Sequence, residues 1–177
     1  MKKMCKRTLC MLLMLACCIF PSTAMAAESK DTDVIVTVEH EDQDLFEMYG
    51  NVFEERRVGS RRSTVDLSEG QSSFTIGVLD AGEEYTTDTY NITKAKIKVG
   101  LQSLGGASPH IKVTLYKSSG VSVGVTTVIL PWASIGNGTG GRTVTFSNLD
   151  TSTNYYVVIE NMDTKATGSI ICIVKQA

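Results

Sequence analysis

The chain has 177 residues, of which 42% are apolar and 20% charged, with 15 glycines and three prolines. This composition supports one packed domain and excludes a wholly disordered chain, a collagen-like repeat and a coiled coil. The formal net charge is −2, and it becomes about −6 if the basic N-terminal segment is removed, so we set nucleic acid aside as a partner.

The first 26 residues have the order of a secretory signal peptide. Residues 1–7 carry four bases and no acid, and residues 8–20 form an apolar stretch too short for a permanent transmembrane anchor. Ala24-Met25-Ala26 then supplies the small residues that a signal peptidase accepts. We therefore predict cleavage after Ala26 and a secreted, bacterial-type extracellular protein. Cys17, which ends Leu15-Ala16-Cys17, offers a lipoprotein anchor as the alternative.

Charge is unevenly distributed after this signal. Residues 27–55 hold ten acids and one base, residues 56–62 hold four arginines, and the balance is nearly neutral from residue 72 onward. Such a step in composition is typical of the boundary between a tail and a domain. It predicts a largely flexible spacer over residues 27–71 and a folded domain over residues 72–177.

Two short elements and two processing sites are predicted within this spacer. Residues 34–38 are β-branched and favour a short strand, and residues 45–49 favour a helical turn. The dibasic pairs that end at Arg57 and Arg62 would be open to proteases. Cleavage there would release the domain from a pro-segment, and a plain solubilising spacer is the alternative.

Residues 72–177 carry the pattern of β-strands almost throughout. Residues 92–101 alternate strictly, with Lys94, Lys96 and Lys98 on one face and apolar side chains on the other. Turn-forming clusters separate about seven such segments, and no window shows a helical stripe. An antiparallel β-sandwich, jelly-roll or immunoglobulin-like, is therefore predicted, with an up-and-down barrel as the alternative. The predicted strands are residues 73–78, 92–101, 110–117, 121–130, 142–146, 154–161 and 169–175.

One motif near the end of the chain resembles known families. In Leu149-Asp150-Thr151-Ser152-Thr153-Asn154-Tyr155, a leucine precedes a tyrosine by six positions, and apolar residues follow at alternate positions. This resembles the tyrosine corner of fibronectin type III-like sandwiches. With Phe146, it is equally similar to jelly-roll modules appended to secreted bacterial enzymes. The resemblance implies that the Tyr155 hydroxyl satisfies backbone groups at a bend, in an architecture common to extracellular binding modules.

Catalytic and metal-binding patterns find little support. The only histidines are His40 and His110, and zinc-ligand spacing does not occur. Cys172 is the single cysteine after the signal and lies in an apolar run, which favours a buried hydrophobe over a reactive thiol. Asp150 and Asp163 fall in turns, where solvation is favoured over calcium binding. We therefore expect no enzyme activity and no cofactor, and a hydrolase is the least favoured function.

A row of lysines is the first candidate for ligand binding. The lysine row comprises Lys94, Lys96 and Lys98, and Lys112 would extend it if the two strands were adjacent. It could meet an anionic wall polymer, or the acidic segment of the same chain, by charge complementarity. The alternative is a lysine-protected outer face that keeps the sheet soluble.

Aromatic side chains are the second candidate. Trp132 lies beside Pro131 and a glycine-rich loop, and Tyr116 and Tyr156 lie in predicted strands. Exposed aromatic faces bind sugars because pyranose C–H groups pack on them. Tyr156 should face opposite Tyr155, so one of the two could be exposed. The alternative places Trp132 in the core.

Together these observations predict a secreted, non-catalytic extracellular binding module for a polysaccharide or a surface protein partner. A structural protein that self-assembles by strand pairing is the alternative function. The sequence does not determine the ligand or the oligomeric state.

Overall fold

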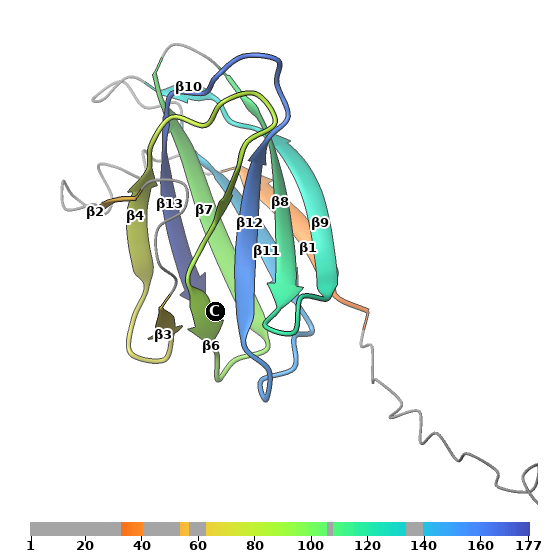
Figure 1. Ribbon diagram of the computed structural model, residues 1–177. Helices are drawn as coiled ribbons and strands as arrows, with labels where there is room; N and C mark the ends of the chain where they lie inside the picture. Colours follow the sequence, from red (N-terminus) through yellow and green to blue (C-terminus); the bar gives the residue numbers. More distant parts are fainter. Residues whose placement is uncertain (1–32, 41–53, 57–62, 106–107, 134–139) are drawn as a thin grey trace, which may run out of the picture. The chain divides into compact units, whose positions relative to one another are not determined.

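The computed structural model describes residues 33–40, 54–56, 63–105, 108–133 and 140–177. Every regular element in these ranges is a β-strand, and the thirteen strands form two sheets that pack face to face (Figure 1). The predicted all-β sandwich is therefore confirmed, with more and shorter strands than expected. No helix in the described part of the chain is long and apolar enough to cross a membrane. Ala26, Cys17, residues 45–49, Arg57 and Arg62 lie outside the described residues.

Sheet A has seven strands in the order β1-β11-β7-β13-β4-β2, with β10 paired to β7 off this path. The central pairs are antiparallel, whereas β2–β4 and β10–β7 are parallel. The strands are β1 (Ile35–His40), β2 (Glu54–Arg56), β4 (Ser72–Ile76), β7 (Lys96–Leu104), β10 (Trp132–Ala133), β11 (Arg142–Ser147) and β13 (Ser169–Gln176).

Sheet B has six strands in the order β3-β6-β12-β8-β9, with β5 paired to β12 off this path. The strands are β3 (Thr64–Asp66), β5 (Glu84–Thr86), β6 (Thr89–Asn91), β8 (His110–Lys117), β9 (Ser122–Ile129) and β12 (Tyr155–Asn161). β5 and β6 follow one another along the same side of β12. Thr86 pairs with Val158 and Tyr90 pairs with Tyr155. The segment from β5 to β6 therefore has one residue more than the part of β12 that it faces, as in a β-bulge.

Three strands come from the segment that was predicted to be a flexible spacer. β1, β2 and β3 pair with β11, β4 and β6, so the described sandwich extends beyond the predicted boundary at residue 72. The strand predicted at residues 34–38 is confirmed as β1. The step in charge did not mark the domain boundary, because β1 is an edge strand whose side chains are mostly exposed. Exposed positions accept acidic residues, so this strand has the composition of a flexible tail although its backbone is hydrogen-bonded in the sheet.

The sheets meet through the alternate, inward-facing side chains of their long strands. These positions on β7, β8 and β12 are buried, as the alternation predicted. Cys172 on β13 is buried among them, which confirms a packing role, and burial raises the pKa of its thiol. The Tyr155 hydroxyl accepts from the N–H of Asp150 at 2.9 Å and donates to the Asp150 carbonyl at 3.2 Å, as the tyrosine corner implies.

Candidate functional site

The structure separates the predicted ligand-binding residues into three places. Tyr116 and Tyr156 come together on sheet B. The lysine row lies on sheet A, on β7 and in the turn before it. Trp132 belongs to β10, where it pairs with Ser103 toward the far end of β7, and its side chain is outside the described residues. The tyrosine pair is therefore the one predicted group that the fold assembles.

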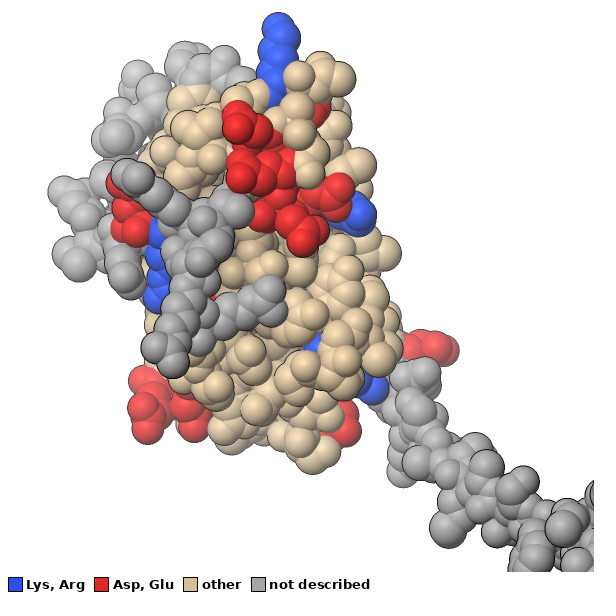
Figure 2. All heavy atoms as spheres, viewed as in Figure 1, with Lys and Arg blue, Asp and Glu red and all other residues tan. Residues whose placement is uncertain are grey.

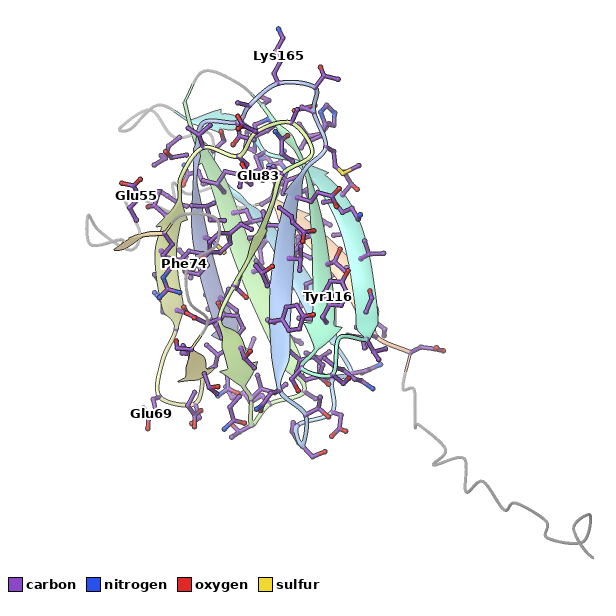
Figure 3. The ribbon with its side chains drawn as sticks, viewed as in Figure 1. Glu55, Glu69, Phe74, Glu83, Tyr116 and Lys165 are labelled. Atoms are coloured by element: carbon purple, nitrogen blue, oxygen red, sulfur yellow. The ribbon has the colours of Figure 1, made fainter. Side chains whose placement is uncertain are left out.

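Tyr116 and Tyr156 form a stacked pair on adjacent strands. They are direct partners in the antiparallel register of β8 and β12, so their side chains leave the same face of sheet B at the same point. The ring centroids are 5.2 Å apart, the ring planes differ by 7°, and both side chains are half-buried. Figure 3 shows Tyr116 on the face of sheet B that is turned toward the viewer. Tyr155 points into the core, as the alternation predicted.

The next residues along β8 and β12 continue this outer face. Thr114 and Val158 are partners next to the tyrosines and are buried. Beyond them, the Nζ of Lys112 donates to Oε2 of Glu160 at 2.8 Å, and this hydrogen bond and the negative charge raise the pKa of Lys112. Lys112 thus belongs to sheet B and is paired there. The prediction that it extends the lysine row is wrong, because β8 and β7 lie in different sheets.

The end of this face near Glu160 is acidic. Figure 2 shows Asp and Glu side chains gathered there on the surface turned toward the viewer. Glu84 faces Glu160 across the β5–β12 pair, and the turn before β5 is held against the end of β12 by backbone hydrogen bonds. The acidic residues of this end are Asp80, Glu83, Glu84, Glu160 and Asp163. Such a charge distribution favours a neutral or cationic ligand over an anionic one.

The tyrosine pair and its surroundings are suited to binding rather than to bond cleavage. Aromatic rings offer an apolar body for C–H contacts, and each phenol hydroxyl can both donate and accept a hydrogen bond. Because the two rings cover one face of each other, a ligand would contact their outer faces, edges and hydroxyl groups.

The lysine row faces outward from sheet A and meets strand β1. The Nζ of Lys98 donates to Oε2 of Glu39 at 3.4 Å, so an acid of the N-terminal acidic segment pairs with this row. Lys96 is half-buried, and Lys94 is exposed in the turn before β7. Glu39 thus neutralises part of the positive charge of the lysine row, so the row would attract an anionic polymer less strongly than three unpaired lysines would.

The catalytic candidates do not form a reactive constellation in the described residues. The N–H of His110 donates to Oδ2 of Asp163 at 2.9 Å, and its Nδ1 lies 2.9 Å from Oδ1. These contacts lower the pKa of Asp163. Cys172 is buried between the sheets, and no cluster of three metal-ligating side chains occurs in the part that the structure describes. The Asp150 carboxylate accepts from Ser152 and so closes its own turn.

Two buried polar groups were not identified from the sequence. Asp88 pairs with Arg56 between the sheets, and Asn161 binds three backbone carbonyls at the end of β12. The available signal was a polar residue within an otherwise apolar strand pattern, as at Asn161. Asp88 connects the edge of sheet B to β2 of sheet A, and Asn161 connects the loop before β5 to the loop after β12.

Comparisons with known proteins add little to this geometry. No protein-family model matches the chain, and no curated protein matches it. Among solved structures, the pre-peptidase C-terminal domain of a collagenase from Bacillus anthracis is similar, with 15% sequence identity and a TM-score of 0.41. The match covers 71% of this chain and 100% of that domain. A similarity this low assigns no function.

Proposed function

We propose that this protein is a secreted, non-catalytic binding module that recognises a neutral polysaccharide through the outer face of sheet B. The observation that carries the proposal is the parallel, half-buried stack of Tyr116 and Tyr156 on that face. The acidic end near Glu160 supports a neutral ligand over the anionic polymers that the lysine row could attract. A cross-strand aromatic pair also stabilises a sheet, so the test must separate binding from folding.

Replacing both Tyr116 and Tyr156 by alanine should weaken the affinity for an insoluble neutral polysaccharide, such as cellulose, by roughly tenfold or more, which is a loss of about 1.4 kcal/mol of binding free energy. The variant should still unfold cooperatively, because a cross-strand aromatic pair contributes only about 1 kcal/mol to a sheet. Sedimentation with the polysaccharide and thermal unfolding of the same samples measure the two effects.

Two control variants locate the site. Lys96→Ala combined with Lys98→Ala changes the outer face of sheet A and should leave the retention unchanged. Trp132→Ala should also leave it unchanged, and a loss of retention in that variant alone would move the site to the β10 end of sheet A. Full retention of the double tyrosine variant would contradict the proposal, as would a wild-type chain that no neutral polysaccharide retains.

Export is part of this proposal. The mature chain in the culture medium should begin at Ala27, which intact-mass spectrometry of the secreted protein measures. A start directly after Arg57 or Arg62 would show that a protease removes the preceding segment, including β1 and β2. A diacylglycerol-modified Cys17 in the membrane fraction would contradict release of the protein.

A further inference from the structure

Strand β9 is a sheet edge that, from Gly124 to Ile129, lacks the features that usually protect an edge. It ends the order of sheet B, pairs with β8 on one side, and no described strand is hydrogen-bonded to its other side. Charged residues, prolines and bulges normally block such an edge, because its free backbone groups can pair with another chain. The eight residues of β9 include no charged residue and no proline, and the irregularity in its pairing lies near the Ser122 end.

The backbone groups of alternate β9 residues point to this open edge. The N–H of Leu130 donates to the carbonyl of Pro109, next to β8. Successive residues of an antiparallel strand form hydrogen bonds to opposite sides in turn. The even-numbered residues before Leu130 therefore bond toward β8, and Val125, Thr127 and Ile129 direct their N–H and C=O groups away from it.

The side chains at these positions are self-complementary. Val125 and Ile129 are 55% and 50% exposed, and Thr127, also exposed, lies between them on the same face. If a second copy of β9 pairs antiparallel with Thr127 opposite Thr127, Val125 of each copy faces Ile129 of the other. Both of these cross-strand pairs then join β-branched apolar side chains, which are favourable partners in a sheet.

The absence of charge points to a second copy of this chain as the occupant. The residue on a two-fold axis faces its own copy, so a charged residue at that position would face a like charge. Residues 121–130 are all uncharged. By contrast, β1, the edge strand of sheet A, carries Glu39, which pairs with Lys98 of its own chain.

We propose that two copies of this chain associate through β9, antiparallel about a two-fold axis at Thr127, and join their B sheets into one continuous sheet. In antiparallel pairing this axis is perpendicular to the sheet, so the outer faces of both copies lie on the same side. Two tyrosine stacks would then be available to one polysaccharide chain. That consequence rests on the proposed function, whereas the dimer does not.

The test is the mass of the full secreted chain in solution, measured by sedimentation velocity over a range of concentrations without polysaccharide. The wild-type chain should change from monomer to dimer as its concentration rises. Thr127→Lys should lose the dimer, because two lysines meet at the axis, and Thr127→Glu should lose it for the corresponding reason. An equimolar mixture of these two variants should regain the dimer mass, because the charges at the axis are then opposite.

The matched control is Thr37→Lys, the same change on an exposed position of the edge strand β1. It should leave the dimer unchanged, and thermal unfolding should show every variant to be folded. The proposal is overturned by a wild-type chain that stays monomeric at all concentrations, which includes the case in which its own N-terminal segment occupies the edge. It is also overturned if the Thr127 variants keep the dimer, if their mixture stays monomeric, or if Thr37→Lys abolishes the dimer.

Discussion

Arg56→Met should lower the free energy of unfolding by about 3 kcal/mol at neutral pH. Arg56 on β2 of sheet A forms an ion pair with Asp88, which lies between β5 and β6 of sheet B and is 4% exposed. The guanidinium carbon also lies 4.8 Å from the centroid of the Phe74 ring. Removing the guanidinium leaves a buried carboxylate without its counter-charge, which is more costly than loss of an exposed pair.

The pH dependence of this loss would identify the carboxylate as its cause. Burial by itself would raise the pKa of Asp88, but the Ser63 N–H and the Arg56 guanidinium outweigh burial, and the pKa lies below its usual value. A carboxyl with a lowered pKa stabilises the fold above the pKa of the unfolded chain, and this contribution is lost as pH falls through the folded-state pKa. On acidification the free energy of unfolding should therefore fall more for the wild-type protein than for Arg56→Met. The difference in stability between the two proteins should become smaller as pH falls.

Urea unfolding of both proteins, from neutral pH down through the range in which carboxyl groups titrate, measures this difference. Lys112→Met is the matched control, because it removes the cation of a more exposed ion pair with Glu160. Lys112→Met should lower the free energy of unfolding much less than Arg56→Met does, and this smaller loss should not show the same narrowing as pH falls. A difference between wild type and Arg56→Met that stays constant at every pH would show that the charge of Asp88 is not its source.

The strand pattern of the main domain was predictable because the alternation of side chains depends on local sequence. Residues 92–101 and 110–117 correctly predicted which side chains of β7 and β8 face the core. The spacing from Leu149 to Tyr155 likewise predicted the hydrogen bonds of the tyrosine corner, because a bend of fixed length brings the hydroxyl back to Asp150.

The partners of each strand were not predictable, because pairing joins segments that are distant in sequence. Nothing in residues 54–56 specifies their parallel pairing with residues 74–76, so β2 was taken for part of a spacer. The same reason applies to Lys112, since alternation gives the face of a strand but not the sheet to which it belongs. Tyr116 and Tyr156 were identified as candidates, but their stacking depends on the register between β8 and β12.

The buried Asn161 was the least predictable feature, because its partners are backbone groups. Asn161 ends an apolar strand, where a solvated turn is the usual expectation for asparagine. The structure instead places it at 0% exposure among carbonyl groups of two other loops. Its importance for the fold therefore follows from the hydrogen bonds and not from the sequence pattern.

Asn161→Asp should destabilise the protein more than Asn161→Ala at neutral pH. The side-chain Nδ2 donates to the carbonyls of Leu79 and Asp80, each at 3.1 Å, and of Lys165 at 2.8 Å. Its Oδ1 accepts from the N–H of Asp163 at 3.0 Å. One amide therefore ties the loop before β5 to the loop after β12, at the acidic end of the outer face of sheet B.

The two substitutions destabilise the folded protein for different reasons. Alanine leaves the Lys165 carbonyl and the Asp163 N–H without this partner, which should cost about 2 kcal/mol. The Leu79 and Asp80 carbonyls keep the N–H groups of Thr167 and Glu83 as donors. Aspartate keeps the shape but places a negatively charged oxygen against those carbonyls, so its loss should be larger. The pKa of this new carboxyl should be raised in the folded state, because only the protonated form supplies a donor. Asn161→Asp should therefore recover stability relative to wild type as pH falls through that raised pKa.

Urea unfolding against pH measures these differences, and amide hydrogen exchange locates them. The N–H groups of Gly82 and Thr167, which donate to the carbonyls of Asn161 and Leu79, should exchange faster in both variants, while the amides of β8 keep their protection. Asn154→Asp, at a half-exposed position, is the control and should have a small effect. If Asn161→Asp were no more destabilising than Asn161→Ala at neutral pH, the hydrogen bonds from Nδ2 to the three carbonyls would not be what stabilises this end of the sheet, and the two loops would have to be held together by other contacts.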